Sequence, residues 1–428
     1  METITINQFA GFKEASIETG SITLMIGPQA SGKSIVAKLL FFFREIGYEL
    51  HGSALAGTSV AQFKEESKKK FCRYFPADSW PQKNFLIIYK SNQEQVRVEY
   101  NHCEGKTPED SISITLSTFY EDSLASFSTR WGALASGIPE GDSQKGEQAR
   151  NQFQEEVFGA MERALGNWSK FQQFFIPAGR AFYSHLEASV FRALETGQDM
   201  DPFLVKFGAF VERSKQVLYE RRFFKKGTDK NDSMNAFQKM LATVLSADFK
   251  RVKGHDYLQY TSDKRRVRLA QASSGQQEAL PMLLVLGRFF SLSHISGRSV
   301  YIEEPEAHLF PSTQRKIVEF MASTYRMRQD QMCLVITTHS PYILTAINNL
   351  LQAGKIYKSV LKPEASRKLE AIIPSDHALF PGEVKAYSLE NGESKSIICA
   401  ETNLIEADII DKVSSDISVQ FDKLLEHL

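Results

Sequence analysis

A phosphate-loop pattern near the amino end restricts this chain to a small set of folds. Residues Gly27-Pro28-Gln29-Ala30-Ser31-Gly32-Lys33-Ser34 fit G-x-x-x-x-G-K-[ST]. The apolar run 22–26 before the pattern reads as a buried strand, and apolar residues recur at helical spacing after it, from Ile35 to Phe43. A strand that turns into a helix through such a loop predicts an α/β fold with a phosphate-binding helix N-terminus.

The residues of this segment also predict which groups contact a bound nucleotide. Glycines let backbone N–H groups approach an anion closely, and the helix dipole adds to the attraction. We expect Lys33 to reach the β and γ phosphates of ATP and Ser34 to ligate Mg²⁺. The alternative is a glycine-rich turn before an ordinary helix. The predicted ATP-binding residues are Gly27, Gln29, Ala30, Ser31, Gly32, Lys33, Ser34 and Ile35.

Three later segments extend this site. Residues Ser273-Ser274-Gly275-Gln276 precede the apolar helix predicted over 282–290, and they expose backbone N–H groups at its start. By themselves they could equally be a helix-capping turn. A predicted strand at 298–302 leads into Glu303-Glu304-Pro305-Glu306, and another at 332–338 leads into His339.

Carboxylates at the end of a strand beside a phosphate loop can hold Mg²⁺ and polarise an attacking water. Glu303 is the candidate metal ligand and Glu304 the candidate base. His339 is the candidate γ-phosphate contact, because an imidazole can hydrogen-bond phosphate in either charge state. The predicted catalytic residues are therefore Glu303, Glu304 and His339, with Ser34 and Glu303 as Mg²⁺ ligands.

In this order the four segments resemble the Walker A, signature, Walker B and H-loop of ABC-type ATPases. The wording Ile-Glu-Glu-Pro-Glu-Ala-His-Leu-Phe-Pro followed by Thr-Thr-His-Ser-Pro-Tyr resembles the OLD-like branch of AAA ATPases. The resemblance implies an ABC-type P-loop ATPase head, α/β with a mixed β-sheet and a helical insertion. It also implies a head-to-tail homodimer in which Ser273, Ser274, Gly275 and Gln276 of one protomer contact ATP held by the other.

The sequence departs from that pattern in places. Glu303 stands where many family members carry Asp, so the metal and base roles stay open among Glu303, Glu304 and Glu306. For the Q-loop glutamine only Gln172 and Gln173 are candidates. Arg180 is a candidate phosphate or interface contact, with a surface ion pair as the alternative.

The pattern along the chain predicts three parts. Residues 1–118 form an ATPase lobe with an antiparallel segment, in which 85–89 and 96–100 make a hairpin and 112–116 adds a strand. Residues 119–250 form a helical insertion with a loop at 136–146. Residues 251–428 complete the ATPase lobe and end in a hairpin, 384–389 with 397–399, and an amphipathic helix after Ile409.

Composition narrows the class further. The 428 residues carry 51 basic and 51 acidic side chains, so no net field draws the chain to nucleic acid or to a membrane. Four scattered cysteines without a C-x-x-C pair are typical of a reduced cytoplasmic protein. The polar, alternating start at 1–6 does not read as a leader, and the longest apolar stretch, 279–290, is too short to span a bilayer.

The run Arg221-Arg222-Phe223-Phe224-Lys225-Lys226 is a candidate nucleic-acid contact, with a solvated helix end as the alternative.

The resemblance stops short of nuclease activity, because the tail after His339 is too short for a Toprim domain and lacks Asp-x-Asp. Stand-alone ATPases of this kind resemble the ATPase subunits of bacterial antiphage systems such as Septu and PARIS, where a separate HNH or Toprim nuclease supplies toxicity. We therefore expect a cytoplasmic sensor ATPase that uses ATP and Mg²⁺, pairs with itself and controls a separate effector. The alternative is a DNA-repair or recombination ATPase of the RecF or SMC type. A transporter subunit is disfavoured by the roughly 240 residues between the first two motifs.

Overall fold

A computed structural model describes residues 2–80, 83–139, 142–186, 200–219, 230–252, 254–291, 297–359, 363–406, 419–420 and 422. The basic run 221–226 lies outside the described residues, as does the predicted helix after Ile409 apart from residues 419–420 and 422. Within the described residues, no helix combines the length and apolar character needed to cross a membrane.

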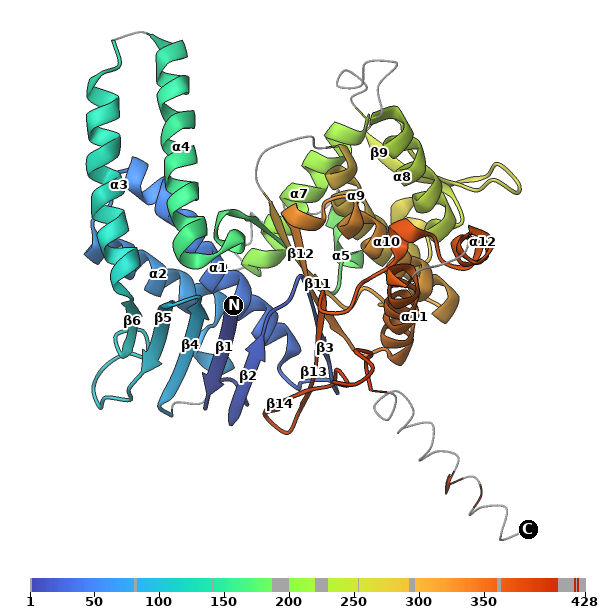
Figure 1. Cartoon of the computed structure of the whole chain (residues 1–428), viewed down its shortest axis with the longest axis horizontal. Coiled ribbons are helices and arrows are strands. Elements are labelled where there is room, and N and C mark those ends of the chain that lie inside the picture. The colour runs from blue at the N-terminus through green and yellow to red at the C-terminus, as the bar shows by residue number, and fades with distance from the viewer. Residues whose placement is uncertain are drawn as a thin grey trace.

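The core of the fold is an eleven-stranded mixed sheet in the order β6-β5-β4-β1-β2-β14-β13-β3-β12-β11-β7 (Figure 1). The antiparallel half contains β1 (Glu2–Asn7), β2 (Glu14–Glu18), β4 (Phe85–Ser91), β5 (Glu94–Tyr100) and β6 (Ile112–Leu116). The parallel half contains β3 (Ile22–Ile26), β7 (Gln172–Ile176), β11 (Arg298–Glu303), β12 (Met332–Thr338) and β13 (Val384–Glu390). Strand β14 (Glu393–Ser396) pairs with β13 and joins the two halves.

Most of the parallel half reads in the sequence as continuous apolar runs, because its strands are covered on both faces. Every residue of β3 and of β12 is buried. One hydrophobic cluster packs α9 (Ser274–Ser291), α10 (Pro311–Arg326) and α11 (Pro341–Lys358) against this half. A second cluster joins the antiparallel half to α1 (Lys33–Leu55) and α2 (Val60–Tyr74).

The remaining helices form two further groups. α3 (Thr118–Ser136) and α4 (Ser143–Leu165) make a long hairpin beside the antiparallel half (Figure 1). α5 (Ala181–Leu186), α7 (Pro202–Tyr219) and α8 (Lys230–Leu245) pack near α9, and α12 (Pro363–Ile372) follows α11. A small antiparallel sheet joins β8 (Asp248–Val252), β9 (His255–Gln259) and β10 (Arg266–Arg268).

Three local predictions need correction. The segment 119–250 is not helical throughout, because Gln172–Ile176 form β7, whose partner β11 is far away in the sequence. The return strand of the last hairpin is β14 at 393–396 rather than 397–399. Asn391 and Gly392 both have positive φ, so they form a two-residue turn that starts the return strand at once. The apolar helix predicted over 282–290 begins eight residues earlier, at Ser274.

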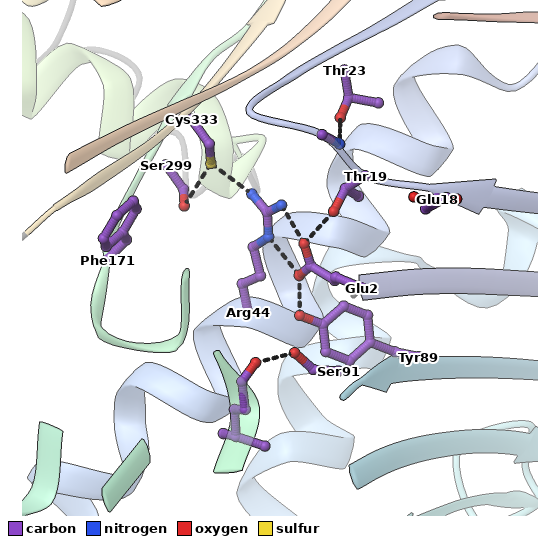
Figure 2. Close-up of polar contacts among 12 residues, drawn as sticks. Glu2, Glu18, Thr19, Thr23, Arg44, Tyr89, Ser91, Phe171, Ser299 and Cys333 are labelled. Atoms are coloured by element: carbon purple, nitrogen blue, oxygen red, sulfur yellow. Dashed lines mark hydrogen bonds and ion pairs between the residues drawn. The ribbon is translucent and has the colours of Figure 1, made fainter. Parts of the chain in front are cut away.

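A buried ion pair between Arg44 and Glu2 connects the two halves of the sheet (Figure 2). Arg44 of α1 donates from Nε to Oε1 of Glu2 at 2.8 Å and from a terminal nitrogen to Oε2 at 2.6 Å. Its other terminal nitrogen contacts Tyr301 of β11 and Cys333 of β12, while Tyr89 and Thr19 donate to Glu2. Arg44 and Glu2 are each only 2% exposed. One guanidinium therefore connects α1 to strands of both sheet halves.

Candidate active site

The phosphate loop, residues 27–34, joins β3 directly to α1, as predicted. Both glycines of the loop are required, because a side chain at either position would collide with a neighbouring residue. A Cβ on Gly27 would lie 2.2 Å from the carbonyl oxygen of Leu389, and one on Gly32 would lie 2.4 Å from the Phe12 ring. Gly32 also has φ +92°, a conformation that other residues rarely adopt. Gln29, Ala30 and Ser34 are exposed, and Ile35 packs against the second hydrophobic cluster.

Lys33 lies inside the curve of this loop. Its Nζ donates to the carbonyl oxygens of Gly27 at 2.9 Å and Pro28 at 2.7 Å, and it lies 3.3 Å from Oγ of Ser31. Burial lowers the pKa of Lys33 to about 8, although the nearby Glu304 and Glu306 carboxylates oppose this shift. Lys33 is therefore an ammonium group held by acceptors that a phosphate could replace.

Three predicted site residues from different segments meet at this point. Nδ1 of His339 is 3.4 Å from Nζ of Lys33, and Nε2 of His339 is 3.3 Å from Oε1 of Glu304. The segments meet because β3, β12 and β11 are adjacent and parallel, so their carboxyl ends share one edge of the sheet. The structure thus brings together the phosphate loop, the acidic segment 303–306 and His339.

The three acidic residues have different environments. Glu306 is buried, and its Oε1 accepts hydrogen bonds from Oγ1 of Thr338 and from the backbone N–H of His339, both at 2.7 Å. It therefore fixes the loop that carries His339, a role that the sequence did not reveal. The Glu304 side chain is 38% exposed and points to His339. Glu304 also has φ +43°, which is strained for a residue with a side chain.

Glu303 fits a metal ligand. It is 5% exposed, and its Oε2 accepts a hydrogen bond from the backbone N–H of Ala178 at 3.1 Å. Its Oε1 has no hydrogen-bond donor among the described residues. A buried carboxylate oxygen without a donor suits a cation, and Mg²⁺ is commonly held by one or two protein ligands together with phosphate oxygens. When bound, Mg²⁺ would supply charge neutralisation between the β and γ phosphates. No group of three or more His, Cys, Asp or Glu that could hold a metal occurs in the described ranges, here or elsewhere.

The signature segment, residues 273–276, starts α9. Ser273 and Gln276 form a capping box, in which Ser273 donates to Oε1 of Gln276 and accepts from the Gln276 N–H. Oε1 of Gln276 also accepts from the Tyr260 hydroxyl, and its Nε2 donates to the carbonyl oxygen of Leu245. The Gln276 side chain is therefore used within its own protomer.

Ser273 and Ser274 remain exposed at the start of this helix. A Cβ on Gly275 would lie 2.6 Å from the carbonyl oxygen of His308, so glycine allows α9 to approach the loop after the acidic segment. A cavity of about 340 Å³ elsewhere, between α1, α7 and β7, is lined by Glu45, Glu49 and Lys206 and is distinct from both segments.

Two sequence predictions fail here. Gln172 and Gln173 begin β7, where they pair with Arg298 and Ser299 at the start of β11. They lie at the opposite end of the parallel strands from the acidic segment and cannot serve as a Q-loop there. Arg180 is fully buried, so it is neither a surface ion pair nor a contact for a partner.

The predicted α/β class with a mixed sheet is confirmed, and the fold and the site define a phosphate-loop ATPase domain of the AAA type. The chain matches, over residues 22–345, the family described as "AAA domain, putative AbiEii toxin, Type IV TA system". It belongs to this family, since the match spans well over half of the sequence. No curated protein matches the chain.

Solved structures with a similar arrangement include an SMC head bound to the C-terminal winged-helix domain of ScpA, with 11% identity, a TM-score of 0.42 and coverage of 92% of this chain and 96% of that one. An SMC head with an extended coiled coil, bound to the C-terminal domain of ScpA derived from Pyrococcus furiosus, has 12% identity, a TM-score of 0.40 and coverage of 98% and 100%. RecF with a bound ATP analogue has 11% identity, a TM-score of 0.31 and coverage of 92% and 97%. At such TM-scores these proteins say nothing about the roles of residues in this chain.

Proposed function

We propose that the chain hydrolyses ATP to ADP and phosphate at sites shared between two protomers, and that this cycle controls a separate effector nuclease in antiphage defence. The observation that carries the ATPase part is the meeting of Lys33, His339 and Glu304 at one edge of the sheet. Lys33 binds phosphate, His339 hydrogen-bonds the γ-phosphate, and Glu304 accepts a proton from the attacking water. Ser34 and Glu303 hold Mg²⁺.

The head-to-tail pairing rests on a separate observation. The described contacts of the phosphate loop go to Phe12, His339 and Leu389, whereas those of the signature segment go to Leu245, Tyr260 and the 308–309 loop. The two segments share no contact residue, although both present exposed serines. A second copy of the chain brings the signature segment onto ATP held by the first. Phe310, 75% exposed, follows the acidic segment in the sequence, and Tyr342, 54% exposed, follows His339; both supply apolar area for the contact.

The control of a separate effector nuclease is the second part of the proposal. Two observations support this part: the sequences of the acidic and histidine segments, and a family description that names a component of a toxin–antitoxin system. ATP turnover moves protomers relative to each other but breaks no bond in a macromolecule, so toxicity requires a second catalytic protein. The helices within 119–250 lie outside the four motifs and are the proposed docking surface, together with the chain after residue 406. We place this complex in the cytoplasm.

The test compares purified wild type with Glu304→Gln, first alone and then from the native host. Wild type should release phosphate only with Mg²⁺. Glu304→Gln should retain ATP and dimerise in size-exclusion chromatography with light scattering. Affinity capture of Glu304→Gln with ATP should enrich a nuclease relative to wild type. If DNA stimulates hydrolysis by the isolated chain and no nuclease is captured, the repair-type alternative is correct. Absence of Mg²⁺-dependent hydrolysis would remove the proposal altogether.

A further inference from the structure

Arg180 is one of the most completely buried charged side chains among the described residues, with no measurable exposure. It follows β7 in the loop that leads to α5. Its guanidinium donates to the carbonyl oxygens of Glu303 at 2.6 Å, Glu304 at 2.9 Å and Pro177 at 2.9 Å. Arg180 therefore binds the backbone of both acidic residues at the end of β11 without touching their carboxylates.

The same residue is bound to the signature helix. Its Nε donates to the carbonyl oxygen of Glu278 at 3.0 Å, and the backbone N–H groups of Arg180 and Ala181 donate to the two carboxylate oxygens of Glu278 at 2.9 and 3.0 Å. Glu278 is 3% exposed and lies one helical turn after Ser274. One rigid, planar group thus joins the start of α9 to the end of β11.

The backbone it holds at Glu304 is strained. Glu304 has φ +43°, and such a conformation persists only where surrounding contacts enforce it. Its N–H donates to the carbonyl oxygen of Thr337 at 2.9 Å, and its own carbonyl accepts from Arg180 and from the N–H of Ala307. These bonds set the direction in which the Glu304 side chain leaves the strand toward His339.

We propose that Arg180 is a positioning residue that aligns Glu304 for proton transfer and, through Glu278, couples that alignment to the signature helix of the same protomer. This inference rests on the proposed shared-site ATPase. In the dimer the signature segment of a protomer contacts the partner's ATP, while its Glu304 faces its own ATP. ATP seated on the signature segment therefore acts through α9, Glu278 and Arg180 on the other site, which makes hydrolysis cooperative.

The test measures steady-state ATP hydrolysis for wild type, Arg180→Lys and Glu278→Gln. Lysine keeps the charge but cannot reach both the Glu278 and the Glu303–Glu304 carbonyls. Arg180→Lys should lower kcat about tenfold to hundredfold while changing KM less than about threefold, because a small misplacement of a catalytic group is costly and the phosphate loop is untouched. Glu278→Gln removes the carboxylate charge that lies 3.4 Å from Nε of Arg180 and weakens the link to α9, while the backbone carbonyl of residue 278 can still accept from Arg180. It should keep at least half of kcat at saturating ATP but lower the Hill coefficient from above 1 toward 1.

Arg326→Lys is the matched control. Arg326 is also nearly buried, binds the Glu383 carboxylate at 3.0 and 2.7 Å, and contacts the backbone carbonyl of Ala378, away from the acidic segment. It should lose stability without a change in kcat or in cooperativity. If Arg180→Lys does not fold, Glu278→Gln decides alone. Wild-type kcat in Arg180→Lys, or a Hill coefficient unchanged in Glu278→Gln, would overturn the inference while leaving the ATPase proposal intact. Lack of hydrolysis by wild type would overturn both.

Discussion

At the residue scale, the position of Lys33 links nucleotide binding to pH. Burial lowers its pKa to about 8, so the ammonium form dominates at neutral pH. A bound phosphate favours that charged form and raises the pKa again. Binding then requires uptake of a proton whenever the pH lies above about 8. ATP affinity should be constant below that pH and should fall up to tenfold per unit above it.

Isothermal titration of ATP between pH 7 and 9.5 measures this slope. Lys33→Arg provides the control, because the guanidinium stays charged over the whole range and removes the slope. Lys33→Ala should bind ATP about 10- to 100-fold more weakly at neutral pH, since a charge-assisted bond worth roughly 1.5–3 kcal/mol is lost. A wild-type affinity that does not vary from pH 7 to 9.5 would contradict the proposed coupling between protonation of Lys33 and ATP binding.

A second residue-scale prediction concerns Glu304. The change to Gln keeps the size and the contact with His339 but removes the proton acceptor. Hydrolysis should fall by about 10²- to 10⁴-fold while ATP binding persists. Glu306→Gln differs, because Oε1 of Glu306 holds the loop that carries His339. It should reduce hydrolysis less and should lower the thermal midpoint, which differential scanning fluorimetry measures. Equal kinetic losses in both variants, with no loss of stability, would contradict these assignments.

At the element scale, the Arg44 and Glu2 pair holds α1 against both halves of the sheet (Figure 2). Burial alone would raise the pKa of Glu2, but the charge of Arg44 and hydrogen bonds from Arg44, Thr19 and Tyr89 lower it overall. The pair therefore stabilises the fold above pH 4.5, and this contribution is lost as the pH falls through the lowered pKa.

Arg44→Ala should lower the free energy of unfolding by about 3–5 kcal/mol, because it leaves a buried carboxylate without its partner. In this variant burial raises the pKa of Glu2, so stability should increase as the pH falls toward 4.5, whereas the contribution of the wild-type pair stays constant over that range. Adding Glu2→Gln should recover part of the loss. Chemical denaturation at pH 5 and pH 7.5 provides the measurement, and additive losses in the double variant would show that the two side chains do not act as a pair.

The strands differ in how well the sequence predicts them. β3 and β12 are predicted to the residue, because strands buried on both faces are continuous apolar runs. β7 begins with two glutamines and has only a short apolar run, 174–176, among helical patterns, so only its distant partner β11 makes it a strand. β14 is polar and mostly exposed, so only the Asn391-Gly392 turn indicates it.

The site shows the same limit. Lys33, Glu304 and His339 are identified by motifs, and strand order brings them together. Arg180, Glu278 and Glu306 act through backbone contacts with residues distant in the sequence, which no local pattern encodes. Glu278 lies one turn after Ser274, so both residues are on one side of α9, but this spacing does not predict that Glu278 contacts Arg180.

At the scale of the whole molecule, each proposed ATP site is built from two copies of the chain. The phosphate loop and the signature segment have separate sets of contacts within a protomer, and in the proposed dimer the signature segment of one protomer completes the ATP site of the other. Ser274→Arg should preserve ATP binding by a single protomer, because Ser274 is exposed and outside the phosphate loop. It should abolish hydrolysis, because bulk and charge at the start of α9 keep the partner's ATP from closing onto it.

Mixing two inactive variants tests this central claim most directly. Lys33→Ala loses the lysine of the phosphate loop but keeps an intact signature segment, and Ser274→Arg has an intact phosphate loop and an obstructed signature segment. Each mixed dimer holds one intact pair of segments, so the equimolar mixture should regain up to about a quarter of the wild-type hydrolysis rate, given half of the dimers mixed and one site in each. Folded variants that stay inactive together at all ratios, although native mass spectrometry shows that they pair, would contradict a shared ATP site.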